Sequence, residues 1–262
     1  MIVANIATYP PRRESLVAVL SQISPQVDKI NLVLNEYADI PAEISQFTNV
    51  DAVIPHEDTK DAGKFYINVS EADYVFLIDD DIIYPADFVT RSVERFKQLG
   101  NGFVASYHGS IYQKPRIKMR KIRPRASVLK AFVAGIVSDI EDIKEHKIRL
   151  ADFRKVFSFY RHLDTAVIVD QIGTGTAILR GSDTPSYDYM RDSQKFVDVR
   201  FAKWAFDRGL SSVVLPKDDD WLKPIRYEET IWETFTQSNP PHVNAEIMSF
   251  AFKSPRLGET LK

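Results

Sequence analysis

The chain has 262 residues, of which 44% are hydrophobic and 27% are charged, and this ordinary globular composition excludes disorder as the default state. A formal charge of −2 gives no overall attraction to nucleic acid, and the lack of cysteine excludes disulfides, thiolate metal sites and a cysteine nucleophile. No apolar run approaches the ~20 residues of a membrane-spanning helix, and the first residues lack the pattern of a signal peptide. We therefore expect a soluble, cytoplasmic protein without a nucleic-acid partner.

Strands and helices are predicted to alternate through the first 107 residues. Short apolar runs bounded by turn residues predict strands, and apolar residues at helical spacing predict helices. The predicted strands are Ile2–Thr8, Ile30–Leu34, Val50–Ile54, Tyr74–Ile78 and Phe103–Tyr107. The predicted helices are Arg12–Ile23, Asp58–Ala72 and Ala86–Leu99. Such an alternation with short connections is typical of an α/β protein with a mostly parallel sheet flanked by helices.

The middle of the chain breaks this pattern. Lys114–Arg125 contains seven Lys or Arg residues in twelve positions and no acids, and the following sequence to about His162 is mixed and charged. We interpret residues 110–165 as a basic, partly helical flap inserted into a single domain spanning residues 1–262. The simplest role is a solvated flap. The alternatives are a surface that gathers an anionic acceptor, or one that contacts a membrane carrying a lipid-linked acceptor.

The α/β pattern resumes at Ala166–Val169. Further strands are predicted at Ala177–Leu179 and Val213–Leu215, and a helix is predicted at Phe196–Gly209, closed by its glycine. From Lys217 onward no regular element is predicted.

Three consecutive carboxylates, Asp79–Asp81, follow the apolar strand Tyr74–Ile78 and precede Pro85. Burying adjacent anions without a partner is costly, so they should lie at the carboxyl end of the strand, where open α/β sheets bind ligands. Carboxylate oxygens suit Mg²⁺ or Mn²⁺, which in turn hold phosphates. The alternative is a solvated acidic loop, which is the simpler interpretation of a second triplet, Asp218–Asp220.

Five motifs, taken in order, resemble a family-2-like glycosyltransferase of the GT-A fold. They are Ala7-Thr8-Tyr9-Pro10 followed by Arg12-Arg13; Leu34-Asn35-Glu36; Asp61-Ala62-Gly63-Lys64-Phe65-Tyr66; Ile78-Asp79-Asp80-Asp81-Ile82-Ile83-Tyr84-Pro85; and Gly173-Thr174-Gly175-Thr176-Ala177 with Phe196–Ala202. The resemblance covers most of the chain and implies a Rossmann-like GT-A domain. It also implies a metal-dependent, inverting transfer of a sugar from a nucleoside diphosphate sugar, with a UDP-sugar favoured. The implied acceptor is a glycan or a lipid-linked acceptor in surface polysaccharide synthesis.

The resemblance implies roles for individual residues. Residues 1–109 would bind the nucleotide sugar and residues 166–262 the acceptor. Asp79 and Asp81 would hold Mn²⁺ or Mg²⁺, and Asp198 would be the general base. The donor would be bound by Ala7, Thr8, Tyr9, Arg13, Asn35, Glu36, Asp61, Lys64, Asp79 and Asp80. The acceptor would contact Gly173, Thr174, Gly175 and Trp221.

Several alternatives stay open from the sequence. The family more often has two acids where this chain has Val197-Asp198, and Asp198 could simply cap a helix. Trp221 could stack on a sugar or pack in the core, and His108 and His242 are more often structural than metal ligands. A sugar nucleotidyltransferase would favour a glycine-rich loop after the first strand, which this chain lacks. An intact acidic triplet argues against a non-catalytic glycan-binding domain. The chain could also be one module of a larger polymerase or complex.

Overall fold

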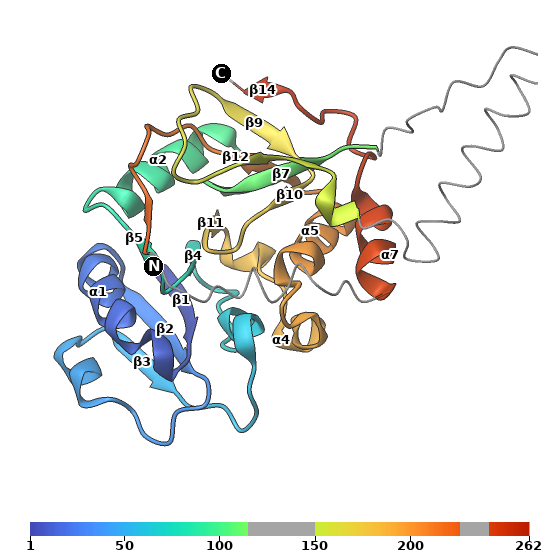
Figure 1. Cartoon of the computed structure of the whole chain (residues 1–262). Helices are drawn as coiled ribbons and strands as arrows, with labels where there is room; N and C mark the ends of the chain where they lie inside the picture. The colour runs from blue at the N-terminus through green and yellow to red at the C-terminus, as the bar shows by residue number, and fades with distance from the viewer. Residues whose placement is uncertain (115–149, 226–240, 262) are drawn as a thin grey trace, which may run out of the picture.

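The computed structural model describes residues 1–114, 150–225 and 241–261. Its centre is a nine-stranded mixed sheet in the order β14-β9-β12-β6-β11-β4-β1-β2-β3 (Figure 1). The strands are β1 (Ile2–Thr8), β2 (Lys29–Leu34), β3 (Val50–Val53), β4 (Tyr74–Ile78), β6 (Phe103–Ser106), β9 (Ala166–Val169), β11 (Thr176–Leu179), β12 (Ser211–Val214) and β14 (Thr260–Leu261). In this sheet β11 and β9 run against the direction of the others. The expected α/β class with a mostly parallel sheet is confirmed.

Helices cover both faces of this sheet. The α-helices are α1 (Arg13–Ile23), α2 (Phe88–Leu99), α4 (Tyr187–Met190), α5 (Val197–Asp207) and α7 (Pro241–Phe250). The 3-10 helices are η1 (Pro10–Arg12), η2 (Ser24–Gln26), η3 (Ala42–Gln46), η4 (Lys60–Phe65), η5 (Leu150–Asp152), η6 (Gly181–Asp183) and η7 (Arg191–Ser193). None of the helices in the described ranges is long and apolar enough to span a bilayer.

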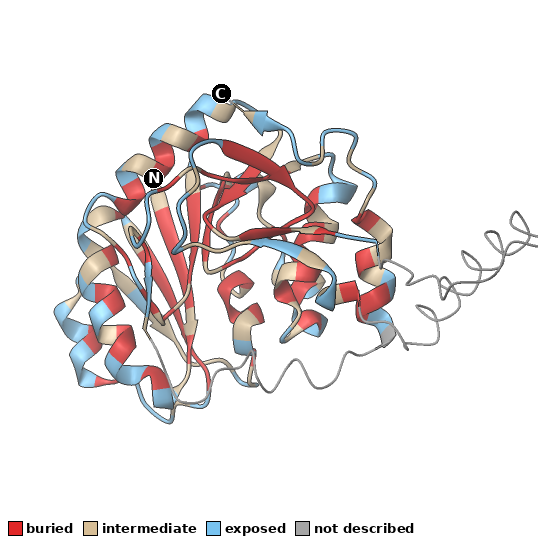
Figure 2. Cartoon of the chain, turned by 45° about the horizontal axis from the view of Figure 1, so that its top comes forward, coloured by how far each residue is buried: buried red, intermediate tan, exposed pale blue. Residues whose placement is uncertain are grey.

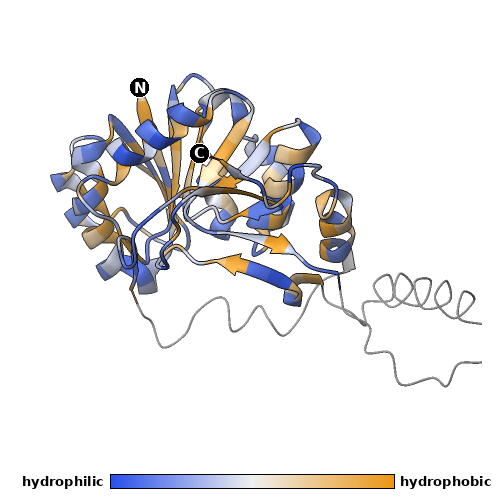
Figure 3. Cartoon of the chain, turned by 90° about the horizontal axis from the view of Figure 1, so that it is seen from above, coloured by the Kyte–Doolittle hydropathy of each residue, from blue (hydrophilic) through white to orange (hydrophobic). Residues whose placement is uncertain are grey.

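The alternation of side chains along β4 explains why the sheet has two cores. Phe76 and Ile78 pack on the face covered by α1 and α2, whereas Val75 and Leu77 pack on the face covered by α5. Because successive side chains of a strand point to opposite faces, an all-apolar strand must be covered on both sides. Figure 2 shows these central strands buried along their length, and Figure 3 shows the apolar strands flanked by helices with hydrophilic outer surfaces.

Two small sheets lie beside the large one. Strands β7 (Gly109–Tyr112), β8 (Arg154–Phe157) and β10 (Gln171–Ile172) form an antiparallel sheet in the order β10-β7-β8. Strand β5 (Ile82–Ile83), directly after the acidic triplet, pairs with β13 (Lys223–Pro224). Apart from Lys114, the basic run Lys114–Arg125 lies outside the described residues, as does most of the expected flap.

The helix expected at Asp58–Ala72 is wrong, because the structure has only the 3-10 helix η4 there. The Lys64 carbonyl accepts a hydrogen bond of 2.8 Å from the Asn5 side chain, which ties this segment to β1. Gly63 packs so closely that an added Cβ would lie 2.5 Å from Thr59 Oγ1 and 3.0 Å from Ala7 Cβ. Contact with the sheet therefore overrides the helical pattern.

The expectation of an irregular C-terminal segment is also wrong. Helix α7 packs Val243, Ile247 and Phe250 against α5, around Val199 and Ala202. These three apolar residues have the spacing of one helix face, and the segment closes with β14 on the edge of the sheet.

Candidate active site

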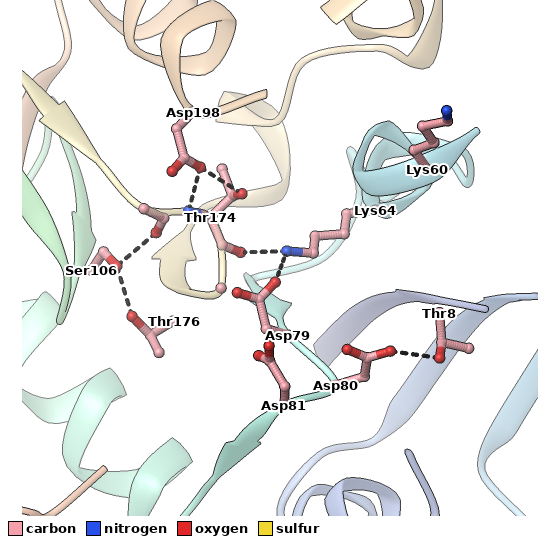
Figure 4. Close-up of polar contacts among 12 residues, drawn as sticks. Thr8, Lys60, Lys64, Asp79, Asp80, Asp81, Ser106, Thr174, Thr176 and Asp198 are labelled. Carbon is pink, nitrogen blue, oxygen red and sulfur yellow. Dashed lines mark hydrogen bonds and ion pairs between the residues drawn. The ribbon is translucent and has the colours of Figure 1, made fainter. Parts of the chain in front are cut away.

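Five segments bring polar side chains to one edge of the large sheet. Strands β1, β2 and β4 are parallel and end together at Thr8, Leu34 and Ile78. Strand β11 runs the other way, with Thr176 opposite Ile78, so the loop Gly173–Gly175 that precedes it lies at the same edge. The first turn of α5 adds Asp198 above this loop (Figure 4).

Lys64 and Asp79 form a buried ion pair at the centre of the site (Figure 4). The Lys64 side chain is 4% exposed, and its Nζ also lies 3.4 Å from the Thr174 carbonyl oxygen. Burial alone lowers the pKa of Lys64, but the carboxylates of Asp79, Asp198 and Asp61 outweigh burial and raise it overall. Lys64 is therefore held as a cation among three acids.

Gly175 brings the loop into direct contact with the acidic triplet. A Cβ at this position would lie 1.8 Å from Asp79 Oδ2, so only glycine allows this approach. The Gly175 carbonyl accepts hydrogen bonds from the Asp79 amide at 3.1 Å and from the Tyr84 hydroxyl at 2.6 Å. Loop and triplet are thus built as one unit.

The other two acids of the triplet have different partners. Asp80 is buried and accepts a hydrogen bond of 2.6 Å from the Thr8 hydroxyl, and burial is the main cause that raises its pKa to about 7. Asp81 accepts a hydrogen bond of 3.0 Å from Arg12, whose side chain is 5% exposed. Burial and the neighbouring Asp79 charge raise the pKa of Asp81.

Arg12 is a site residue that the sequence analysis missed. We predicted a donor-binding role for Arg13, but its guanidinium forms two hydrogen bonds, of 2.7 and 2.6 Å, with Glu43 at the surface. Pro10 and Pro11 begin the 3-10 helix η1, which buries Arg12 and leaves Arg13 exposed. The two prolines could have indicated this, because proline favours the first positions of a helix and so fixes where η1 begins and which arginine it buries.

The acidic triplet suits a divalent cation that is shared with a phosphate ligand. No group of three His, Asp or Glu residues within the described ranges forms a metal cage by itself. Mg²⁺ is commonly held by only one or two carboxylates together with substrate phosphates. The side chains of Asp79 and Asp81 are 39% and 34% exposed, and their mutual repulsion would be relieved by a dication. The residues present therefore fit such an ion.

Asp198 is held by the same loop. Its Oδ1 accepts hydrogen bonds of 2.8 Å from both the amide and the hydroxyl of Thr174 (Figure 4). The Gly173 carbonyl accepts a hydrogen bond of 2.8 Å from Ser106, and the Gly173 amide donates one of 2.9 Å to the His108 carbonyl. The loop Gly173–Gly175 is thus held by hydrogen bonds to Asp198, to the segment Ser106–His108 and to the triplet acid Asp79.

Asn35 and Asp61 bind the backbone around η4. Asn35 accepts hydrogen bonds from the Thr59 amide and hydroxyl at 2.9 and 2.7 Å and donates one to the Lys60 carbonyl at 3.1 Å. Asp61 accepts a hydrogen bond of 2.6 Å from the Lys195 amide, and burial is the main cause that raises its pKa to about 6. Asn35 thus fixes the start of η4, and Asp61 ties η4 to Lys195, just before α5.

The remaining predicted residues lie less centrally. Ala7 packs beneath Gly63, and the Tyr9 carbonyl closes η1 by accepting a hydrogen bond from the Arg12 amide at 2.9 Å. Glu36 is exposed, with a left-handed φ of 59°.

Trp221 packs against α2, as one of the two alternatives expected. It donates a hydrogen bond of 3.0 Å to Asp87, and its ring lies 4.9 Å from that of Tyr107 and 4.8 Å from the Arg91 guanidinium. The second triplet, Asp218–Asp220, is exposed. Roles for Trp221, Arg13 and Glu36 in ligand binding stay predictions.

Asp170, a second carboxylate near α5, already binds two backbone amides. It accepts hydrogen bonds from Tyr112 at 2.8 Å and from Phe252 at 3.2 Å, one on each oxygen. Burial is the main cause that raises its pKa to about 6. Asp170 therefore joins β7 to the C-terminal segment.

The chain is an α/β protein with a cluster of buried charged side chains, a candidate ligand site, at the carboxyl edge of its sheet. No family model matches the sequence, and no match was found among curated proteins.

Several solved structures are similar to the chain, and three of them illustrate the likeness. One is glucosyl-3-phosphoglycerate synthase from Mycobacterium tuberculosis in complex with Mn²⁺, UDP and phosphoglyceric acid, at 13% identity and a TM-score of 0.49, over 95% of this chain and 78% of that one. The same enzyme with Mn²⁺, UDP-glucose and phosphoglyceric acid matches at 18% identity and a TM-score of 0.33, over 40% of this chain and 42% of that one. A mycobacterial protein matches at 14% identity and a TM-score of 0.47, over 89% of this chain and 69% of that one. Because identities and TM-scores are this low, the function has to be inferred from the site itself.

Proposed function

We propose that the protein is a metal-dependent glycosyltransferase of the GT-A type. It would move a sugar from a nucleoside diphosphate sugar, with a UDP-sugar favoured, to a hydroxyl group of a glycan or lipid-linked acceptor. The observation that carries the proposal is the loop Gly173–Gly175, which contacts the triplet acid Asp79 on one side and Asp198 on the other. The assignment of residues 1–109 to the donor and 166–262 to the acceptor belongs to this proposal.

The donor side of the site supplies charge for a diphosphate. Asp79 and Asp81 would hold Mn²⁺ or Mg²⁺, which neutralises negative charge on the leaving diphosphate when bound. Lys64 is a buried cation beside Asp79, and Arg12 is a buried cation beside Asp81. Each can hydrogen-bond phosphate oxygens once the metal ion shares its carboxylate partner. Thr8 holds Asp80 in place behind them.

Asp198 would remove the proton of the acceptor hydroxyl. Within the described ranges both of its hydrogen bonds go to Oδ1, so Oδ2 can accept a proton. As the acceptor oxygen bonds to the anomeric carbon, the bond from that carbon to the diphosphate breaks and the hydroxyl proton passes to Asp198. A single displacement of this kind inverts the anomeric configuration, so the product configuration tests this part of the proposal.

The biological setting also stays a prediction from the sequence. It comprises surface polysaccharide synthesis, a cytoplasmic location with peripheral contact to the inner face of a membrane, and membership of a larger complex.

A thermal-shift screen of nucleotides and sugar nucleotides, with and without Mn²⁺, tests the donor site. A ligand at 100 times its dissociation constant stabilises the folded state by about 2.7 kcal/mol. We expect stabilisation by UDP or a UDP-sugar that requires Mn²⁺ and is lost in Asp81→Asn, where the amide oxygen can still accept the hydrogen bond from Arg12.

The matched control is Asp218→Asn, in the exposed second triplet. It should behave as the parent does. A parent that is not stabilised by any nucleotide, or an Asp81→Asn variant that binds as the parent does, contradicts the proposed donor site.

A further inference from the structure

Lys217 is a buried cation that the proposed mechanism does not use. Lys217 is 2% exposed. The Leu163 amide donates a hydrogen bond of 2.8 Å to the Lys217 carbonyl, and the Lys217 amide donates one of 2.9 Å to the Leu163 carbonyl. Within the described ranges its ammonium group has no ion pair or hydrogen bond, and the nitrogen itself is not fully shielded from solvent. Burial, followed by the nearby charge of Arg95, lowers the pKa of Lys217 to about 8, so the ammonium is still charged at neutral pH. Because the side chain is largely desolvated and its charged end has no partner among the described residues, an anion that reaches this end from outside the chain would stabilise it.

Lys217 lies at the same sheet edge as the candidate active site. Strand β12 runs parallel to β6 with Val214 opposite Ser106, and the Leu215 amide donates to the Ser106 carbonyl at 2.8 Å. Residues 216 and 217 therefore continue past the end of β6, where His108 follows. His108 in turn contacts Gly173, at the start of the loop that holds Asp198.

His108 adds a second unsatisfied nitrogen. Its Nδ1 is buried and has no hydrogen-bond partner in the described part of the chain. Burial lowers the pKa of His108, the Asp198 carboxylate raises it, and the charges of Arg154 and Lys217 lower it further. His108 lies against Gly173, at the start of the loop that holds Asp198, and a neutral imidazole can donate from Nδ1.

We propose that Lys217 and His108 bind an oxyanion, a phosphate or a carboxylate, on the acceptor substrate, beside the hydroxyl that Asp198 deprotonates. That the oxyanion belongs to an acceptor substrate rests on the proposed function. The oxyanion site itself rests only on the nitrogen atoms of Lys217 and His108. The ammonium supplies a charge-assisted hydrogen bond, which is stronger than a neutral one. Acceptors with such a group would be selected over neutral ones, because a neutral acceptor leaves the ammonium unpaired.

The direct test is binding of inorganic phosphate to the full chain, measured by calorimetry on the parent, Lys217→Met and Lys97→Met. Lys97 is an exposed lysine of α2, so its variant is the matched control. We expect phosphate affinity to fall at least about tenfold in Lys217→Met, as for a lost hydrogen bond to a charged group, and to stay unchanged in Lys97→Met. Acetate in place of phosphate shows whether the site prefers a carboxylate.

Stability without phosphate separates a ligand site from a packing role. Lys217→Met should unfold at a temperature at least as high as the parent's, because an unpaired buried charge has been replaced by an apolar chain of similar length. Equal affinity of the parent and Lys217→Met for both anions overturns the proposal. If Lys217→Met does not fold, Lys217→Gln, which keeps a polar end group without charge, takes its place under the same criterion.

Donor binding distinguishes failure of this site from failure of the proposed function. UDP with Mn²⁺ should bind the parent and Lys217→Met alike. If the parent does not bind UDP, the glycosyltransferase proposal fails while the phosphate result stands. In transfer assays Lys217→Met should raise the KM of oxyanion-bearing acceptors and leave the KM of the donor unchanged.

Discussion

Asp198 opens helix α5 and receives both hydrogen bonds of Thr174 on one carboxylate oxygen. In Asp198→Asn the amide oxygen can accept the same two hydrogen bonds, and the loss of a negative charge in the first turn of α5 costs at most about 1 kcal/mol. We therefore expect stability within about 1 kcal/mol of the parent's and unchanged donor affinity, whereas transfer should fall by the ~10²–10⁴-fold typical of a lost general base. Turnover and donor binding of this variant should be measured side by side.

The control for this prediction is Asp192→Asn, an exposed acid in the 3-10 helix η7 shortly before α5. It should transfer sugar as the parent does. Transfer by Asp198→Asn within about threefold of the parent, far less than a lost general base causes, would leave Asp198 a structural residue of the Thr174 loop.

At the scale of an element, the loop Gly173–Gly175 predicts a difference between its two glycines. In Gly175→Ala the new Cβ would lie 1.8 Å from Asp79 Oδ2, so the carboxylate has to leave its place. In Gly173→Ala the nearest atom is His108 Cδ2 at 3.0 Å, which a small shift can relieve. We expect Gly175→Ala to weaken Mn²⁺-dependent nucleotide binding at least about tenfold, which corresponds to ~1.4 kcal/mol, and Gly173→Ala to keep it.

Calorimetry with UDP and Mn²⁺ on the two variants measures this difference, with far-UV circular dichroism to confirm folding. Equal nucleotide affinities in the two variants would show that the contact of Gly175 with Asp79 does not shape the metal site.

At the scale of the whole molecule, buried acids predict how stability depends on pH. Burial is the main cause that raises the pKa of Asp80 to about 7, above the unfolded value of ~3.9. Between these pH values the folded state binds more protons than the unfolded state, so the free energy of unfolding falls as pH rises. From Asp80 alone the fall is on the order of 2–4 kcal/mol.

Urea unfolding from about pH 4.5 to 7.5 on the parent and Asp80→Asn isolates this contribution, since the neutral amide can still accept the hydrogen bond from Thr8. The variant should be at least as stable as the parent at pH 7.5 and should lose less stability across the range. Parallel curves for the two proteins would mean that Asp80 is ionised in the folded state throughout.

Much of the architecture is readable from local pattern. The apolar run of β4 followed at once by Asp79–Asp81 predicts a buried strand with acids at its carboxyl end, because burial tolerates no unpaired anion. The spacing of apolar residues likewise predicts α5 with Asp198 in its first turn. Both were predictable, since they depend only on residues close together in the chain.

Tertiary contacts decided the rest. Two adjacent arginines look alike in the sequence, and the turn of η1 decides which of them faces the triplet. In the structure Arg12 binds Asp81 of the triplet, whereas Arg13 binds Glu43 at the surface. The helical pattern at Asp58–Ala72 yields to the hydrogen bond between Asn5 and Lys64, residues 59 positions apart in sequence. The amino-acid sequence by itself determined the apolar strands and the acids at their ends. The partners of the charged side chains were decided only by the tertiary structure, as was the burial of Lys217, which has no charge partner among the described residues. The physical reason is that desolvation and charge pairing depend on neighbours in space, which distant segments of the chain supply at one edge of the sheet.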